Sequence, residues 1–143
     1  MSAVAEDVIN WDAFAETRGA LGEAFVRILG YFREDGTKSV AEIENAMRDR
    51  SSAGLILPAH TLKGEGYQFG AEKLAELAEE IEVAARHYVE IQQDPSELLE
   101  KVVQLRPLFE LTLDALEREV SPLVERRASF GARTMTQVAS SRF

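Results

Sequence analysis

The residues that could do chemistry lie together in the segment His60-Thr61-Leu62-Lys63-Gly64. An imidazole is a nucleophile and a proton acceptor near neutral pH, and a lysine three residues later on a helix lies beside it. Such a lysine could offset negative charge on a group carried by the histidine. The glycine that follows costs about 1 kcal/mol relative to alanine inside a helix. The segment therefore indicates a nucleophilic histidine, one supporting cation and a neighbouring position without a side chain.

A helical wheel places these residues on the outward side of one helix. A stripe of residues spaced by four, three, four and three is formed by Leu55, Ala59, Leu62, Gly66 and Phe69. Relative to the centre of this stripe, His60 lies at about 140°, Gly64 at about 180° and Lys63 at about 80°. Gly66 faces the core, where it lets another helix approach. Gly64 has no such use, so we interpret it as room for a partner protein.

Apolar side chains near the histidine favour the same interpretation. Ile56, Leu57 and Tyr67 fall outside the buried stripe, and clustered apolar groups on a surface mark contact sites. We therefore expect them to dock a partner, although other helices could cover them instead. Pro58 is unusual inside this helix because it removes one backbone hydrogen bond, so a kink or a late helix start is possible.

Apolar residues recur at spacings of three and four along the rest of the chain, which predicts an all-α protein. The expected helices run from 11 to about 21, from 25 to 35, from 39 to about 48, from about 55 to 69, from 71 to 88, and from 95 to 121. The fold class that we predict is an antiparallel four-helix bundle with an additional short N-terminal helix.

Local signals set these expected boundaries. Asn10 can cap the first helix, and Asp35-Gly36 is a C-terminal signal for the second. Ser39 and Glu42 have the spacing of a capping box, which predicts a new helix start. Pro122 is expected to end regular structure, so we predict a helical domain over residues 1–122 and a basic tail, rich in Ser, Thr and Arg, over 123–143.

Composition and charge exclude several classes of protein. The 143-residue chain has no cysteine, which excludes disulfides, thiolate nucleophiles and cysteine-ligated metal sites. Its net charge of −9 argues against nucleic-acid binding, because a phosphate backbone needs a basic surface. Two histidines without a Glu-x-x-His pairing predict no metal site. No apolar run could span a membrane and no signal-peptide pattern is present, so a cytoplasmic protein is expected.

The motif His60-x-x-Lys63-Gly64, with Phe69-Gly70 closing the helix and Ala-Glu-Lys-Leu-Ala-Glu-Leu beginning the next, resembles a histidine-containing phosphotransfer (HPt) domain. The resemblance covers residues from about 21 to 116. Glu65 departs from the family, which usually has a small residue there. It falls at about −80° on the wheel, away from His60, so little harm is expected.

The resemblance implies a phosphorelay intermediate. His60 would accept a phosphoryl group from a receiver-domain aspartate, or from a sensor histidine kinase, and pass it to another receiver aspartate. Lys63 would stabilise the phosphoryl group, and Glu82 or Gln68 would orient the ring. Mg²⁺ and the catalytic carboxylates would belong to the response-regulator receiver, so the protein would be a monomeric phosphocarrier without a cofactor and not an enzyme.

A second function from another class fits the same sequence. A helical adaptor could bind receiver or kinase domains without being phosphorylated, with His60 as a relic. A sensor-kinase dimerisation helix fits less well, because Thr61 stands where an acidic residue usually follows the histidine and the chain has no glycine-rich nucleotide loop. Acid-labile, alkali-stable labelling by a phosphorylated receiver separates the carrier from the adaptor.

Overall fold

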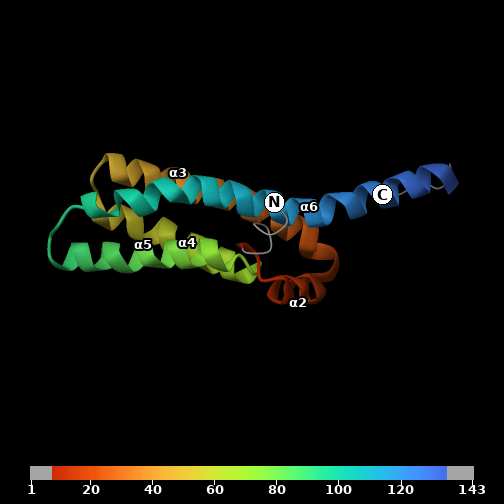
Figure 1. The fold of residues 1–143 in the computed structure, drawn as a ribbon, viewed down its shortest axis with the longest axis horizontal. Helices are drawn as coiled ribbons and strands as arrows, with labels where there is room; N and C mark the ends of the chain where they lie inside the picture. Colours follow the sequence, from red (N-terminus) through yellow and green to blue (C-terminus); the bar gives the residue numbers. More distant parts are fainter. Residues whose placement is uncertain (1–7, 135–143) are drawn as a thin grey trace. The chain divides into compact units, whose positions relative to one another are not determined.

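The computed structural model describes residues 8–134, with side chains described as far as residue 120. Its elements are α2 (Trp11–Leu21), η1 (Gly22–Ala24), α3 (Phe25–Arg48), α4 (Ser52–Gln68), α5 (Glu72–Glu90), η2 (Ser96–Leu98) and α6 (Leu99–Thr134) (Figure 1). No strand occurs within residues 8–134. The all-α prediction is confirmed. The chain divides after Thr112 into two units.

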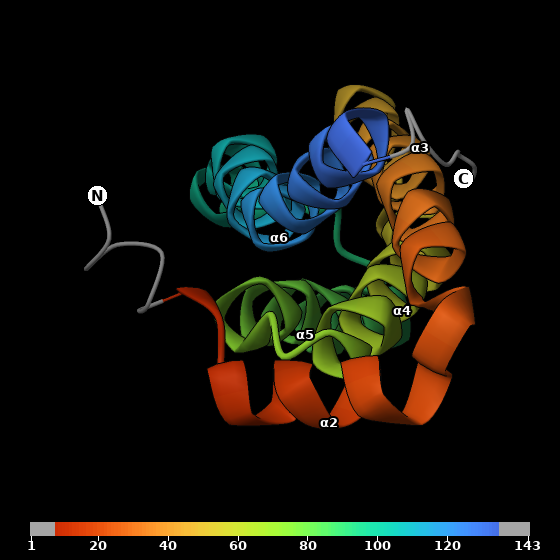
Figure 2. The ribbon, with the colours of Figure 1, turned by 90° about the vertical axis from the view of Figure 1, so that its right-hand side faces the viewer.

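The first unit is an antiparallel four-helix bundle made of α3, α4, α5 and the part of α6 that ends at Thr112 (Figures 1 and 2). Its core is formed by fully or almost fully buried apolar side chains from all four helices, among them Phe32, Ile43, Leu55, Leu62, Leu74, Ile81, Leu105 and Phe109. Viewed along the bundle, α2 lies across the end of α4 and α5 (Figure 2). The predicted bundle with a short additional N-terminal helix is therefore confirmed.

Helix α3 corrects the sequence interpretation, because it continues through Asp35-Gly36 to Arg48. Gly36 does not end the helix; it makes room for a side chain from α6. A Cβ atom on Gly36 would lie 2.4 Å from the Phe109 ring. Ser39, which was expected to cap a new helix, is buried inside α3 at 5% exposure. The two helices predicted over residues 25–48 are one.

Helix α6 also corrects an expected boundary. Pro107 and Pro122 both lie inside the helix, which extends to Thr134. A proline removes one backbone hydrogen bond and strains the preceding turn, but the remaining bonds can carry the helix past it. Residues 135–143 of the predicted basic tail lie outside the described residues, and the predicted division after residue 122 stays a prediction.

The helix that carries His60 is fixed at both ends. The Ser51 side chain accepts a hydrogen bond from the Gly54 backbone N–H at 2.9 Å, so α4 begins well before Pro58. At the other end, Gly70 adopts a left-handed φ of 76°, and its carbonyl accepts a hydrogen bond from the Asn10 N–H at 2.7 Å. A Cβ atom on Gly70 would lie 2.5 Å from the Asn10 carbonyl oxygen, so the turn requires glycine.

Candidate functional site

The buried and exposed sides of α4 follow the helical wheel. The stripe from Leu55 to Phe69 is buried, whereas 56% of the His60 side chain is exposed. Gly64 is exposed, and a Cβ atom built on it would meet nothing within 4 Å. Gly66 is buried, and its Cβ would lie 3.2 Å from the Ala75 Cβ on α5. The two glycines therefore differ as predicted, one open to solvent and one at a helix contact.

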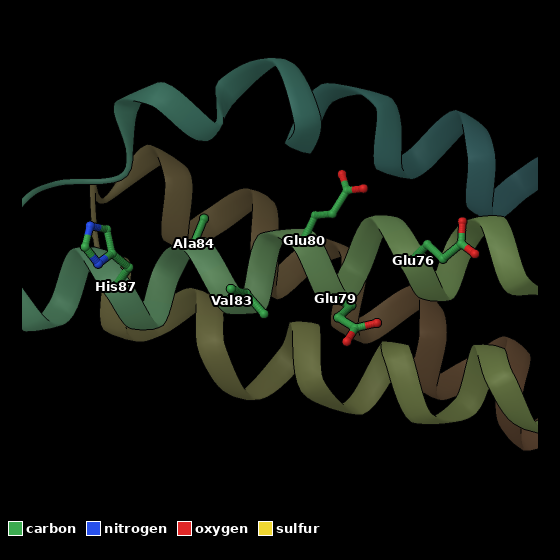
Figure 3. A pocket seen from close by; sticks show the side chains of 6 residues that line it. All are labelled: Glu76, Glu79, Glu80, Val83, Ala84 and His87. Carbon is green, nitrogen blue, oxygen red and sulfur yellow. The ribbon is translucent and has the colours of Figure 1, made fainter.

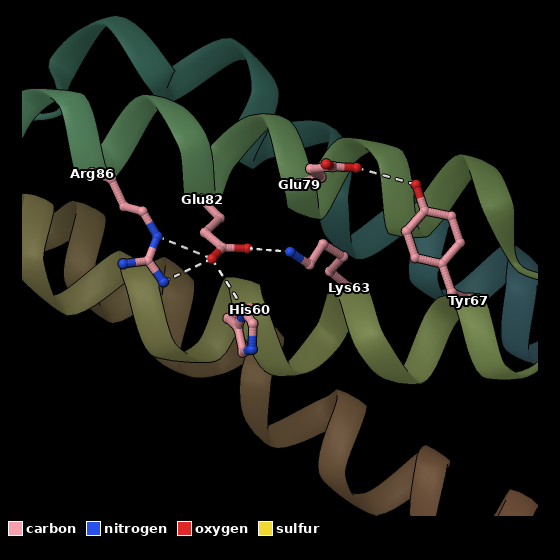
Figure 4. A network of polar contacts seen from close by, with 6 residues as sticks. All are labelled: His60, Lys63, Tyr67, Glu79, Glu82 and Arg86. Atoms are coloured by element: carbon pink, nitrogen blue, oxygen red, sulfur yellow. Dashed lines mark hydrogen bonds and ion pairs between the residues drawn. The ribbon is translucent and has the colours of Figure 1, made fainter.

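The imidazole of His60 is held by a carboxylate on the next helix. Glu82 lies on α5 with only 6% of its side chain exposed, and its Oε2 atom lies 3.0 Å from Nδ1 of His60 (Figure 4). Figure 4 shows the other ring nitrogen turned away from Glu82. Glu82 was one of two residues expected to orient the ring, and the structure brings it to the histidine.

Two cations complete the environment of Glu82. The Nζ atom of Lys63 lies 2.9 Å from Oε1, and the side chain of this lysine is only 25% exposed. Arg86 donates to Oε2 from Nε at 3.1 Å and from Nη2 at 2.8 Å. Arg86 was missed in the sequence, although its position four residues after Glu82 is the usual spacing of an ion pair on a helix.

These partners decide the charge of Glu82. Burial acts to raise the pKa of this carboxyl, but hydrogen bonds from Lys63, Arg86 and His60 outweigh it and bring the pKa to about 2. The carboxylate is therefore ionised at neutral pH and can only accept hydrogen bonds. The proton of a neutral His60 ring consequently lies on Nδ1, and the lone pair lies on Nε2.

The remaining predicted site residues are distributed around this centre. Leu57 is 71% exposed and Tyr67 is 44% exposed, whereas Ile56 is half-buried. The Tyr67 hydroxyl donates to Glu79 Oε1 on α5 at 3.1 Å. Gln68 is not brought to the ring by any described contact; its backbone carbonyl instead accepts a hydrogen bond from the Thr17 hydroxyl of α2. The histidine is thus oriented from α5 through Glu82.

The opposite side of α4 holds a second carboxyl in a different environment. Glu65 lies toward Asp35 of α3, and its Oε1 atom is buried without a described hydrogen-bond partner. Burial, and then the charge and hydrogen bonding of Asp35, raise the pKa of Glu65 to about 7. The expectation that Glu65 points away from His60 holds, but its contact with α3 was not foreseen.

A hollow on the outer side of α5 is separate from the His60 network. It has a volume of about 580 Å³ and is lined by Glu76, Glu79, Glu80, Val83, Ala84 and His87 (Figure 3). His87 is exposed and lies at one end of this hollow. The described lining contains three carboxylates, one of which, Glu80, pairs with Lys101 of α6 at 3.0 Å.

Comparison with known protein families identifies the family of this chain. The family model of the Hpt domain matches residues 27–121, which include all of α4 and α5. The chain belongs to the Hpt domain family. No curated protein and no solved structure matches the chain significantly.

Hpt domains act in phosphorelays by histidine phosphotransfer, and they are phosphocarriers, not enzymes. The family interacts with receiver domains and kinases of two-component systems. In this Hpt domain protein, the helices described within residues 8–134 include none that is long and apolar enough to cross a membrane. The family defines the class of reaction.

Proposed function

We propose that the protein is a phosphorelay intermediate that carries a phosphoryl group on Nε2 of His60. It would accept this group from a receiver-domain aspartate, or from a partner kinase, and pass it to another receiver aspartate. One observation carries the proposal. The Nδ1 atom of an exposed histidine is engaged by an ionised, buried carboxylate, and this leaves the Nε2 lone pair for attack.

The proposed transfer step forms one bond to phosphorus and breaks another. The Nε2 lone pair of His60 forms a bond to the phosphorus of an aspartyl phosphate, while the bond from phosphorus to the aspartyl oxygen breaks. The electron pair of that bond stays on the aspartate, and the Nδ1 proton stays on the imidazole. The ring thereby gains a positive charge, which Glu82 stabilises from 3.0 Å. The reverse step hands the group to the next receiver.

Lys63 is proposed to stabilise the phosphoryl group. It lies three residues after His60, so both side chains are on neighbouring positions of the same helix surface. Before phosphorylation its ammonium pairs with Glu82 Oε1 at 2.9 Å. To contact a phosphoryl group, Lys63 would leave this partner, and Arg86 would remain with Glu82. Mg²⁺ and the catalytic carboxylates are assigned to the receiver, and the carrier needs no cofactor of its own.

Receiver domains are proposed to dock on the outward side of α4. Gly64 leaves open space within one turn of His60, because no atom lies within 4 Å of a Cβ built there. Leu57 and Tyr67 expose apolar surface, and half-buried Ile56 lies on the same helix. A partner surface on this side could approach closely enough for direct attack by the imidazole, for which near-contact distances are needed.

The test is phosphorylation of His60→Gln beside His87→Gln. With a phosphorylated receiver as donor, the unaltered protein and His87→Gln should take up an acid-labile, alkali-stable label, and His60→Gln should take up none. Circular dichroism of His60→Gln should be unchanged, since the side chain is largely exposed. Binding of receivers without any labelling of the unaltered protein would favour the adaptor function instead.

A further inference from the structure

The two oxygen atoms of the Glu82 carboxylate have different partners. One oxygen, Oε2, serves both His60 Nδ1 at 3.0 Å and the Arg86 guanidinium at 2.8 and 3.1 Å. The other oxygen, Oε1, faces Lys63. Arg86 and His60 therefore compete for the same acceptor atom, whereas Lys63 does not.

This competition has different consequences before and after phosphorylation. With a neutral ring, one carboxylate faces two cations, Lys63 and Arg86, and the ring needs no counter-charge. Once Nε2 carries a phosphoryl group and Nδ1 keeps its proton, the ring is itself a cation. A carboxylate at hydrogen-bond distance favours such a cation, and a guanidinium on the same oxygen weakens that effect.

On the basis of the proposed function, we infer that Arg86 is a positioning residue that acts through Glu82: it shares Oε2 with the ring and limits the negative charge that His60 experiences. Arg86 thereby keeps the phosphohistidine ready to give up its phosphoryl group. Without Arg86, more of the negative charge of Glu82 acts on the cationic ring, and the phosphorylated state is stabilised.

Other charged groups do not replace Arg86 in this role. On α4, Lys63 pairs with the other oxygen of Glu82. On α5, Glu79 is one turn away and accepts from Tyr67. Toward α3, Glu65 and Asp35 interact with each other on the opposite side of α4. The described charged groups that contact the ring or its carboxylate are therefore Lys63, Glu82 and Arg86.

The inference is tested without a receiver by labelling the full chain with phosphoramidate. The pH at which phospho-His60 loses its Nδ1 proton is then followed by ³¹P NMR. In Arg86→Gln this midpoint should rise by about half a pH unit, which is about a threefold change in proton affinity. In Glu82→Gln it should fall. Arg86 is 55% exposed, so raising the salt to about 1 M should shrink the Arg86→Gln shift.

Two further variants separate a charge effect from a general structural effect. Arg86→Lys keeps the cation and should return the midpoint toward that of the unaltered protein. Arg106→Gln removes a similar arginine, which pairs with Glu44 at 2.9 and 2.8 Å between α6 and α3, and should leave the midpoint unchanged. An unmoved or lowered midpoint in Arg86→Gln, with His60 still labelled, would overturn the role of Arg86 alone. Failure of phosphoramidate to label His60 in the unaltered protein would overturn both this role and the proposed function.

Discussion

Glu65 lies on the side of helix α4 that faces α3, and Glu82 of α5 lies on the other side. The pKa values of these two carboxyls are shifted in opposite directions. Glu82 is the more deeply buried, yet three donors bring its pKa to about 2. Glu65 is only partly buried, but burial, and then the neighbouring Asp35, raise its pKa to about 7. Burial alone would predict the reverse order. The comparison shows that burial raises the pKa of a carboxyl unless hydrogen bonds from cationic side chains, as at Glu82, outweigh it.

The two carboxyls also affect stability over different pH ranges. The pKa of Glu82 is lowered, so its stabilising contribution is present above the ordinary value of 4.5 and is lost as pH falls toward about 2. The pKa of Glu65 is raised, so its contribution is present below 4.5 and is lost as pH rises through about 7. At neutral pH the carboxyl of Glu82, on the α5 side of α4, is therefore fully ionised, whereas the carboxyl of Glu65, on the α3 side, is only partly ionised.

The largest effect is expected from Gly64→Leu, on the open surface between these two sides. Leucine has free space there and is a better helix former than glycine, so the melting temperature should be kept or raised. A branched side chain should nevertheless hold a receiver away from His60. A misplacement of about 1 Å can cost on the order of a hundredfold in rate, and transfer from a receiver should fall by about that factor.

Two controls decide whether docking is the cause of this loss. Phosphoramidate needs no docking surface and should still label His60 in Gly64→Leu. Gly19→Leu places the same side chain at another exposed and open helical glycine, on α2, and should transfer normally. Normal receiver transfer in Gly64→Leu would contradict docking at this surface, and a large loss of stability would mean that Gly64 is packed.

A smaller effect is expected from Glu65→Gln, and it should appear in stability instead of phosphotransfer. At pH 8 an ionised Glu65 is held unfavourably in the folded protein, so its removal should raise the free energy of unfolding by on the order of 1–2 kcal/mol after allowance for solvent screening. Near pH 4.5 the gain should disappear. Denaturant unfolding at both pH values checks this, with Glu34→Gln as an exposed control on α3.

Phosphotransfer from a receiver should be unchanged in Glu65→Gln, because Glu65 lies on the side of α4 away from the His60 network. A loss of transfer comparable to that of Gly64→Leu would show that the α3 side takes part in docking, and the contrast between the two sides of α4 would then be wrong.

The sequence alone predicted the burial or exposure of residues whose positions depend on helical periodicity. The buried stripe on α4, the exposed His60 and the open Gly64 all follow from spacings within a single helix. Glu82 was a candidate only through the resemblance to the Hpt family, which implies a polar side chain on the next helix, and the sequence could not distinguish it from Gln68. Its contact with His60 depends on how α5 is rotated against α4.

The errors came from signals that have two physical meanings. Asp35-Gly36 has the composition of a helix end, but here Gly36 receives the ring of Phe109, a residue far away in the sequence. No local pattern distinguishes a capping glycine from a packing glycine. The α3 helix was expected to stop at residue 35. Its contact with α4 beyond that residue was therefore not anticipated, and the interaction of Glu65 with Asp35 was missed.

The smallest effect is expected from Asp35→Ala, which separates the two causes of the Glu65 shift. Burial contributes more than Asp35 to the raised pKa of Glu65, so removal of the neighbouring carboxylate should relieve only part of the penalty at pH 8. Comparing pH 8 with pH 4.5 within the same variant cancels the helix preference of alanine. The remaining gain should be about 0.5 kcal/mol, as for other partly exposed charge pairs. Recovery of the whole Glu65→Gln gain would mean that repulsion between the two carboxyls, and not burial, sets the α3 side apart from the α5 side. No gain at all would mean that burial acts alone, and Glu65 would then differ from Glu82 only in lacking hydrogen-bond donors.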